Sequence, residues 1–246
     1  MKPLLTWEYG FNGESSENVT RDYELFQDFE GLSCPVVGRI YTFHKHAATF
    51  GYLTRVQEGF RKRCEQSSIP LIRRCSGGGI SLHGEDICFS FVFRTEMGCS
   101  RLAPMISEKL KLHLAKAAGS WLNMGEIGTE YIEEKATGRE FCIMRKGEHD
   151  IVLGGLKIAG FAGRVAFGKA MVQCQLNSIG WNGGLINTVA GLRVEIPSWY
   201  ERVKEIIFSE EFLSRVKLDI DLLFSNLYGE NKSGKGRISW ERVWGS

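Results

Sequence analysis

The sequence lacks the features that mark several common protein classes. No stretch reaches the roughly 18 consecutive apolar residues that span a bilayer, and residues 1–14 hold no apolar run typical of a signal peptide. Seven cysteines are irregularly spaced without a Cys-x-x-Cys pair, which argues against a zinc ribbon or a disulfide scaffold. A net charge of +2 is too small for a dedicated nucleic-acid binder. We therefore expect a cytoplasmic protein that binds neither membranes nor nucleic acid.

Internal repeats and a linker that would divide the chain are also lacking. The 246 residues, 43% hydrophobic and 24% charged, suffice for one well-buried domain over 1–246. An α+β domain with a sheet covered by helices is the simplest architecture. Apolar periodicity predicts helices over 15–30, 54–66, 104–122, 198–208 and 210–226. It predicts strands over 35–43, 70–74, 87–94, 141–144, 151–153, 156–159 and 169–176, a weaker extended segment over 125–136, and a flexible extension over 229–246.

A glycine-rich segment is the strongest local signal. Gly77, Gly78 and Gly79 follow a predicted strand, with Arg73 and Arg74 shortly before them. Consecutive glycines are unfavourable in chain entropy, so they indicate a positive φ or a close approach by another group. Backbone N–H groups in such a turn, beside two guanidinium groups, suit a phosphate or a carboxylate. On spacing alone, a tight turn with a solvated arginine pair is an equally good interpretation.

Two sequence blocks resemble a known family. The segment RRCSGGGISLH over 73–83, followed by CFSF over 88–91, resembles the signature of lipoate–protein ligase A and its relatives. The segment DIVLGGLKIAG over 150–160 resembles the same family's Asp-x6-Lys-Ile-x-Gly element, in the expected order. The resemblance covers about residues 15–225. It implies the catalytic-domain fold of biotin and lipoate protein ligases, a mixed, largely antiparallel sheet flanked by helices.

The resemblance implies an enzyme that uses ATP and Mg²⁺ to convert lipoate to lipoyl-adenylate. The lipoyl group would then pass to a lysine on a lipoyl domain of a 2-oxoacid dehydrogenase complex or on the glycine cleavage H protein, with a separate accessory domain as a further partner. Lys157 matches the family's essential lysine, whose charge would stabilise developing phosphate or carbonyl oxyanions. No metal ligands are identified. The implied contacts to ATP and lipoyl-adenylate are Arg74, Gly77, Gly78, Gly79, Ile80, Ser81, Leu82, His83, Asp150 and Lys157.

Cys142 suggests an alternative to the ATP-dependent ligase. It lies fifteen residues before Lys157, the spacing of the nucleophile in the family's cysteine-dependent octanoyltransferases. That branch uses no ATP: octanoyl passes from acyl carrier protein to the cysteine as a thioester, and then to the target lysine. Such a thiol needs a neighbouring cation, for which Lys157 and Arg145 are candidates. Alternatively, Cys142 has only a structural role, as a small apolar residue buried in a strand.

The sequence also departs from the family pattern. Gly84 follows the motif histidine where an acidic residue is usual, and Gln173-Cys174-Gln175 stands near the place of a typical His-Gly segment. These departures leave the identity of the acyl chain undetermined. They also motivate a third hypothesis, a non-catalytic protein that binds an acyl group or a lipoyl domain. The two matched blocks favour the ATP-dependent ligase over the other two hypotheses.

Overall fold

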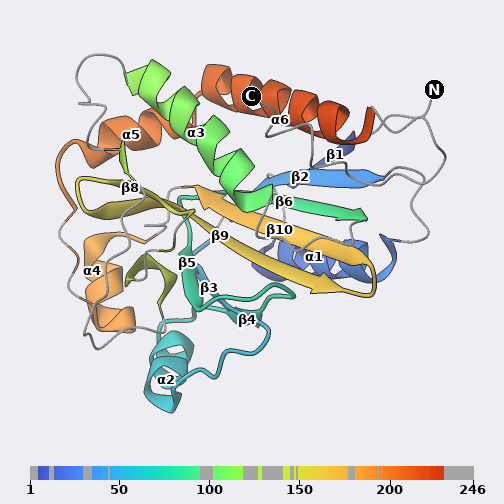
Figure 1. Cartoon of the computed structure of the whole chain (residues 1–246). Coiled ribbons are helices and arrows are strands. Elements are labelled where there is room, and N and C mark those ends of the chain that lie inside the picture. Colours follow the sequence, from blue (N-terminus) through green and yellow to red (C-terminus); the bar gives the residue numbers. More distant parts are fainter. Residues whose placement is uncertain are drawn as a thin grey trace.

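The computed structural model describes the greater part of the chain (Figure 1). The described residues are 5–10, 14–29, 35–43, 45–94, 102–118, 127–128, 141–144, 147, 149–176, 181–192, 194 and 196–229. The strands are β1 (Leu5–Gly10), β2 (Val36–Thr42), β3 (Ala47–Phe50), β4 (Leu71–Arg73), β5 (Ile80–His83), β6 (Ile87–Arg94), β7 (Ile127–Gly128), β8 (Ile151–Leu153), β9 (Leu156–Ala166) and β10 (Lys169–Leu176). The helices are α1 (Ser15–Gln27), α2 (Glu58–Gln66), α3 (Leu102–Ala118), α4 (Gly183–Leu185), α5 (Tyr200–Ile207) and α6 (Glu210–Gly229), with a 3₁₀ turn at Cys142–Met144 and a π-helical turn at Ile186–Ala190.

A seven-stranded sheet in the order β1-β2-β6-β10-β9-β8-β7 forms the centre of the molecule. β1 runs parallel to β2, and every other pair of neighbours in this sheet is antiparallel. The sheet is therefore mixed and largely antiparallel, as the expected fold class requires. β6 lies between β2 and β10, and its first seven residues are buried. The continuous apolar run over 87–94 correctly predicted an interior strand.

A smaller three-stranded sheet, β4-β3-β5, carries the glycine turn. β3 runs parallel to β4 and antiparallel to β5, so residues 74–79 must cross the end of β3. The crossing begins with a hydrogen bond of 2.9 Å from the Arg74 N–H to the Phe50 carbonyl. Further along, the Gly77 N–H donates to the Gly163 carbonyl of β9 at 3.1 Å. The glycine turn thus joins the small sheet to strand β9 of the large one.

Helices cover both faces of the main sheet (Figure 1). α3, α5 and α6 pack on one face, and α1 packs on the other, against β6 and β10. Because side chains alternate along a strand, β6 serves both layers. Phe89 and Phe91 enter the large core, where the Phe91 ring lies 5.5 Å from the ring of Phe224 on α6, whereas Val92 packs with Phe26 of α1. None of the helices in the described part is long and apolar enough to cross a membrane.

The strand predicted over 141–144 is wrong. Phe141 makes a single parallel bridge to Ile80, and Cys142–Met144 form a 3₁₀ turn. Phe141 and Ile143 are buried. An apolar pattern of this length is compatible with a short strand and with a tight turn, so it could not separate the two. The turn matters for the site because it directs the Cys142 thiol toward the glycine segment.

Other boundaries also differ from the predictions. The strand expected over 156–159 continues to Ala166, and the helix expected over 54–66 begins only at Glu58. The sequence patterns miss β1, β3 and β5. β3 and β5 are only four residues long and contain alanine or polar residues of low strand propensity. Of the expected segment 125–136, only β7 is described. The expected extension 229–246 lies outside the described residues beyond Gly229.

Candidate active site

The glycine turn is tightly constrained by its neighbours. Gly78 has φ +86°, and a Cβ added there would lie 2.8 Å from the Arg74 Nη2 and 3.9 Å from the Cys142 Sγ. A side chain at this position would therefore strain the backbone and crowd the arginine. Residues 51–54 hold the turn from outside: the Tyr52 N–H donates to the Ser76 carbonyl at 2.8 Å, and the Thr54 hydroxyl donates to the Gly78 carbonyl at 2.6 Å. The expectation of a positive φ and a close approach is confirmed at Gly78.

The two arginines before the turn point in different directions. Arg73 is exposed, and its guanidinium lies 4.5 Å from the Phe50 ring centroid and donates to the Tyr52 carbonyl at 2.5 Å. Arg74 is buried and donates to the Gly77 carbonyl at 2.7 Å. Its other donors reach the hydroxyls of Ser76 at 3.1 Å and Thr49 at 3.2 Å. A buried guanidinium fixed at all three nitrogens presents a stationary positive charge to the cavity.

Cys142 lies against this charge. Its Sγ is 4.0 Å from the Arg74 Nη2 and is half-buried. The pKa of the thiol is lowered from its ordinary value of 9.0. Burial, the largest single influence, raises that pKa, but it is outweighed by the charges of Arg74 and Lys157 together with hydrogen bonds to the sulfur. Hydrogen bonds from Ser81 and from the Gly79 N–H lower the pKa further. The thiolate is the reactive form, so this environment favours a nucleophilic cysteine.

The other described cysteines contrast with Cys142. Burial raises the pKa of Cys64 to about 11 and that of Cys75 to about 12. Burial also raises the pKa values of Cys88 and Cys174 well above the ordinary range. These four thiols are buried small groups of low reactivity. Of the five cysteines in the described part of the chain, Cys142 alone has the environment of a nucleophile.

Lys157 and Asp150 form a buried ion pair beside the thiol. The Lys157 Nζ lies 2.6 Å from the Asp150 Oδ2, and both side chains are less than a tenth exposed. Asp150 also accepts hydrogen bonds from the N–H groups of Gly147 at 2.7 Å and Phe161 at 3.2 Å. Gly160 leaves the room that the lysine needs, because a Cβ there would lie 2.5 Å from the Lys157 Cε. The DIVLGGLKIAG block is therefore one physical unit that holds an ammonium group at the cavity.

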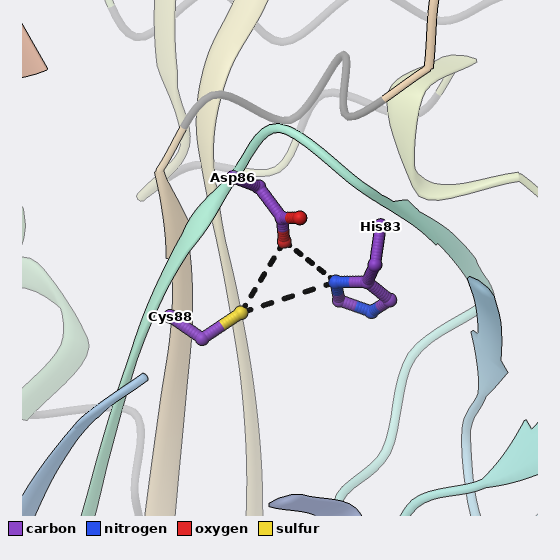
Figure 2. A group of neighbouring side chains, drawn as sticks. All are labelled: His83, Asp86 and Cys88. Carbon is purple, nitrogen blue, oxygen red and sulfur yellow. Dashed lines mark hydrogen bonds and ion pairs between the residues drawn. The ribbon is translucent and has the colours of Figure 1, made fainter. Parts of the chain in front are cut away.

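His83, Asp86 and Cys88 form a buried polar cluster at the cavity wall (Figure 2). The His83 Nδ1 lies 2.6 Å from the Asp86 Oδ2, and the Cys88 Sγ lies 3.4 Å from the same oxygen. These ligand types lie within 4.8 Å of one another, close enough for a metal ion. However, the Gln175 amide nitrogen also donates to that oxygen, at 3.0 Å. A donor group aimed at the shared oxygen indicates a hydrogen-bonded cluster and not an open coordination site.

This cluster is connected to Arg74 through Thr49. The His83 Nε2 lies 2.8 Å from the Thr49 hydroxyl, and that hydroxyl oxygen accepts from Arg74. If Asp86 accepts the Nδ1–H of the neutral imidazole, Nε2 is an acceptor and Thr49 donates to it. The Thr49 oxygen then keeps a lone pair for the guanidinium. Each contact in the series Asp86, His83, Thr49 and Arg74 therefore has one donor and one acceptor.

A second buried network holds the other side of the glycine turn. Asp22 of α1 is fully buried and accepts hydrogen bonds from four side chains. Those donors are Arg39, Tyr41, Ser90 and Gln173. Gln173 also accepts a hydrogen bond from the Ser76 hydroxyl. Gln173, noted in the sequence only as a departure from the family pattern, thus links helix α1 to the serine of the glycine motif.

The groups described above surround one cavity with about 530 Å³ of empty space, part of it open to solvent. Its walls combine a cationic end, near Cys142, with aromatic and aliphatic side chains. The lining residues are Val19, Tyr41, Phe43, Thr49, Arg74, Ser81, His83, Cys88, Cys142, Lys157, Gly160, Phe161, Ala162, Gln173, Cys174 and Gln175.

The structure brings most of the expected site residues together. Arg74, Ser81, His83, Cys142 and Lys157 line the cavity. The side chains of Ile80 and Leu82 instead belong to the core, and Arg145 lies outside the described residues. The glycines lie in the turn and Asp150 supports Lys157, as described above. The lining residues that sequence reasoning missed are Val19, Tyr41, Phe43, Thr49, Gly160, Phe161 and Ala162.

Comparison with known proteins identifies relatives of the chain. Octanoyltransferase LipM from Carboxydothermus hydrogenoformans is 25% identical over 182 residues, which cover 69% of this chain and 64% of that protein. The chain thus spans slightly less than two thirds of the length of this curated relative. Lipoate-protein ligase A bound with ATP superimposes with a TM-score of 0.59 at 17% identity, covering 92% of this chain and 85% of that chain. P. falciparum LipL1 in complex with lipoate gives 0.61 at 15% identity, with 97% and 65% coverage.

At such low identity the two solved structures show a shared fold. The family description Lipoyl protein ligase A/B catalytic domain matches residues 14–180, which include both sequence blocks, Cys142 and most of the cavity. This match extends over more than half of the chain. The chain therefore belongs to the lipoyl protein ligase A/B catalytic domain family, whose members are enzymes of the lipoate ligase and octanoyltransferase type.

Proposed function

We propose that this chain is one catalytic domain of a cysteine-dependent octanoyltransferase, which moves octanoyl from an acyl carrier protein to a lysine of a lipoyl domain without ATP. The observation that carries the proposal is the Cys142 thiol, held beside Arg74 and Lys157 with a lowered pKa. The sequence blocks alone favoured the ATP-dependent ligase. The geometry of Cys142 supports the transferase instead. The similarity to an octanoyltransferase supports the same reading.

In the first step the Cys142 thiolate attacks the carbonyl carbon of the carrier-bound thioester. A new carbon–sulfur bond forms, the bond to the carrier sulfur breaks, and the departing thiolate takes up a proton. The carbonyl oxygen is negatively charged in the tetrahedral intermediate. Lys157 and the Gly79 N–H, which lie near the thiol, are placed to stabilise that charge. One such donor typically contributes a factor of about 10²–10³ to the rate.

In the second step the neutral amine of the acceptor lysine attacks the Cys142 thioester. The amide bond forms, the carbon–sulfur bond breaks, and the amine loses a proton. Cys142 leaves as a thiolate, the form that Arg74 already stabilises. The same charge therefore assists attack in the first step and departure in the second. The acceptors that fit this chemistry are lipoyl domains of 2-oxoacid dehydrogenase complexes or the glycine cleavage H protein.

The cavity offers the acyl tail an apolar wall. Val19, Tyr41, Phe43 and Cys88 form an apolar cluster that contributes to the cavity wall. The Phe43 ring stacks on His83 with centroids 4.0 Å apart, which gives this wall a flat surface. Burying an alkyl chain here would contribute about 0.8 kcal/mol for each methylene removed from water. A thioester at Cys142 could thus extend its tail toward this cluster.

The proposal predicts a covalent intermediate. Incubation with octanoyl-loaded acyl carrier protein and no ATP should add an octanoyl group to the intact protein, located at Cys142 by peptide mass spectrometry. Hydroxylamine should remove it, as expected of a thioester. The matched control is Cys64→Ser, because that thiol is buried away from the cavity lining and has a raised pKa. Full transfer activity in Cys142→Ser would eliminate the proposal.

An ATP-dependent lipoate ligase is the second candidate. The Lys157–Asp150 pair and the glycine turn occupy the positions that the family resemblance assigns to ATP and lipoyl-adenylate. A phosphate at the turn would compete for N–H groups that already have partners: Gly77 donates to Gly163, and Gly79 donates to the Cys142 thiol. This candidate predicts lipoate-dependent exchange of pyrophosphate into ATP with Mg²⁺, either with this chain alone or with a separate accessory domain. Exchange that survives Cys142→Ser and is lost in Lys157→Ala would favour it.

A further inference from the structure

Two large hydrophobic side chains, on segments that contact the glycine turn, are exposed and no contact within the described residues accounts for their exposure. Leu53 is 87% exposed and Phe167 is 88% exposed, the highest values among the large hydrophobic side chains of the described residues. Leu53 lies in the turn over 51–54 that holds the glycine segment from outside. Phe167 lies at the tip of the β9–β10 hairpin (Figure 1). The two segments touch, because the Arg164 guanidinium lies 4.1 Å from the Tyr52 ring centroid.

The backbone conformation at Phe167 is also unfavourable for phenylalanine. Ala166 pairs with Lys169, so Phe167 and Gly168 alone form the turn, with φ values of +53° and +72°. This is the geometry of a two-residue type I′ hairpin, which strongly prefers Asn-Gly. A bulky residue with positive φ is a backbone outlier. Phenylalanine is therefore unfavourable here both for turn formation and for contact with water, which indicates a role in binding.

The segments that form and contact the glycine turn also carry charge of one sign. Residues 51–57, 73–79 and 160–169 contain five cationic residues and no Asp or Glu, although the whole chain has 31 basic and 29 acidic residues. Arg55 and Arg73 are exposed. The next acid in sequence, Glu58, lies within 4.0 Å of cationic side chains on its own helix α2. Exposed apolar side chains among arginines form a surface complementary to an acidic protein partner.

We propose that Leu53, Phe167, Arg55, Arg73 and Arg164 form the docking surface for the acyl donor, an acidic carrier protein that bears its acyl group on a phosphodiester-linked arm. This inference rests on the proposed transferase function. Cations beside the glycine turn attract the phosphodiester and disfavour the approach of a protonated acceptor lysine. The surface is therefore assigned to the donor and not to the acceptor domain.

The first experiment separates docking from chemistry. Octanoyl-loaded acyl carrier protein is titrated against the full chain carrying Cys142→Ala, so that binding is measured without transfer. Adding Phe167→Asn or Leu53→Gln should weaken binding about tenfold, as expected when an anchoring side chain is removed from an interface. Phe167→Asn is a sharp test because asparagine suits the type I′ turn, so the variant should fold at least as well as the parent. Leu218→Gln is the matched control, since Leu218 is 58% exposed on α6, on the opposite face of the sheet.

Charge gives an independent readout. Binding of the loaded carrier should weaken steeply as salt rises, and Arg55→Glu should weaken it and flatten that dependence. If Phe167→Asn and Leu53→Gln bind the carrier as tightly as the parent, the docking proposal is overturned. If they weaken binding of a lipoyl domain instead, the donor assignment is overturned. Failure of the proposed function itself would appear separately, as absent acylation of wild-type Cys142 by octanoyl-N-acetylcysteamine, a small thioester that needs no docking.

Discussion

Gly160→Ala should damage the site through one specific clash. The new Cβ would lie 2.5 Å from the Lys157 Cε and 2.8 Å from its Nζ, and 3.6 Å from the Asp150 Oδ1. To reach an ordinary contact of 3.4 Å, the lysine Cε must retreat by about 0.9 Å. Lys157 is buried and fixed to Asp150 at 2.6 Å, so the ammonium cannot move without disturbing that pair.

The expected loss of stability can be estimated from other proteins in which a methyl group was added to a packed interior. Inserting one methyl group into a well-packed interior typically costs about 1–3 kcal/mol. For a chain of this size, each kcal/mol lowers the melting temperature by about 2–4 °C. Thermal and urea unfolding of Gly160→Ala should show a loss in this range. The rate of octanoyl transfer should also fall, by up to about 10²-fold, because the displaced Lys157 ammonium no longer faces the developing oxyanion.

A double-mutant cycle tests whether the clash with Lys157 causes the loss of stability. In a Lys157→Ala background the atoms that clash are gone, so Gly160→Ala should be neutral or stabilising by about 0.4–1 kcal/mol, because alanine restricts the unfolded chain. Gly160 lies in strand β9 and does not have a positive φ, so no backbone strain adds to the cost. An equal loss of stability in both backgrounds would refute the proposed clash between Gly160 and Lys157.

Two further predictions concern the groups around Cys142, and a third concerns Asp22. Because the Cys142 pKa is lowered, its iodoacetamide alkylation should have a midpoint below pH 9.0, and Arg74→Met should move that midpoint upward; an unchanged midpoint in peptide mass spectra would contradict the role of Arg74. Thr49→Val, which removes the hydroxyl bonded to Arg74 and His83, should move it in the same direction, and Thr49→Ser should restore it. Asp22→Asn should lower the free energy of unfolding by about 3–5 kcal/mol in urea titrations, because Arg39 loses its buried charge partner; a loss below about 1 kcal/mol would contradict this.

Local sequence signals predicted the parts of the site that are continuous in the chain. The glycine turn needs consecutive glycines, and the Lys157–Asp150 unit lies within eleven residues, so both left a compact motif. The strand over 87–94 was equally clear, because both of its faces are buried. Alternating burial at Phe141 and Ile143 was ambiguous, and only tertiary contacts decide between a strand and the observed turn.

The rest of the site could not be predicted because its contacts join distant segments. Thr49 lies in a short strand, Ala-Ala-Thr-Phe, whose composition gives little strand signal. Its neighbours in space are Arg74, which follows β4, and His83, the last residue of β5. Nothing in the local sequence indicates that a threonine bridges these two residues. The lowered pKa of Cys142 has the same origin. It depends on Arg74, which is 68 residues away in sequence.

The glutamines of β10 show how a departure from the family pattern can preserve the site. Because side chains alternate along a strand, Gln173 and Gln175 share one face. Cys174, between them, packs in the large core and also borders the cavity. Gln173 accepts from Ser76 and donates to the Asp22 network, which fixes one side of the glycine turn. Gln175 donates to Asp86 and so supports the cluster that reaches Arg74 through His83 and Thr49. The two neutral amides of this segment therefore stabilise the glycine turn from both sides. The positive charge beside the thiol comes from Arg74 and Lys157, so no histidine is needed at either glutamine position.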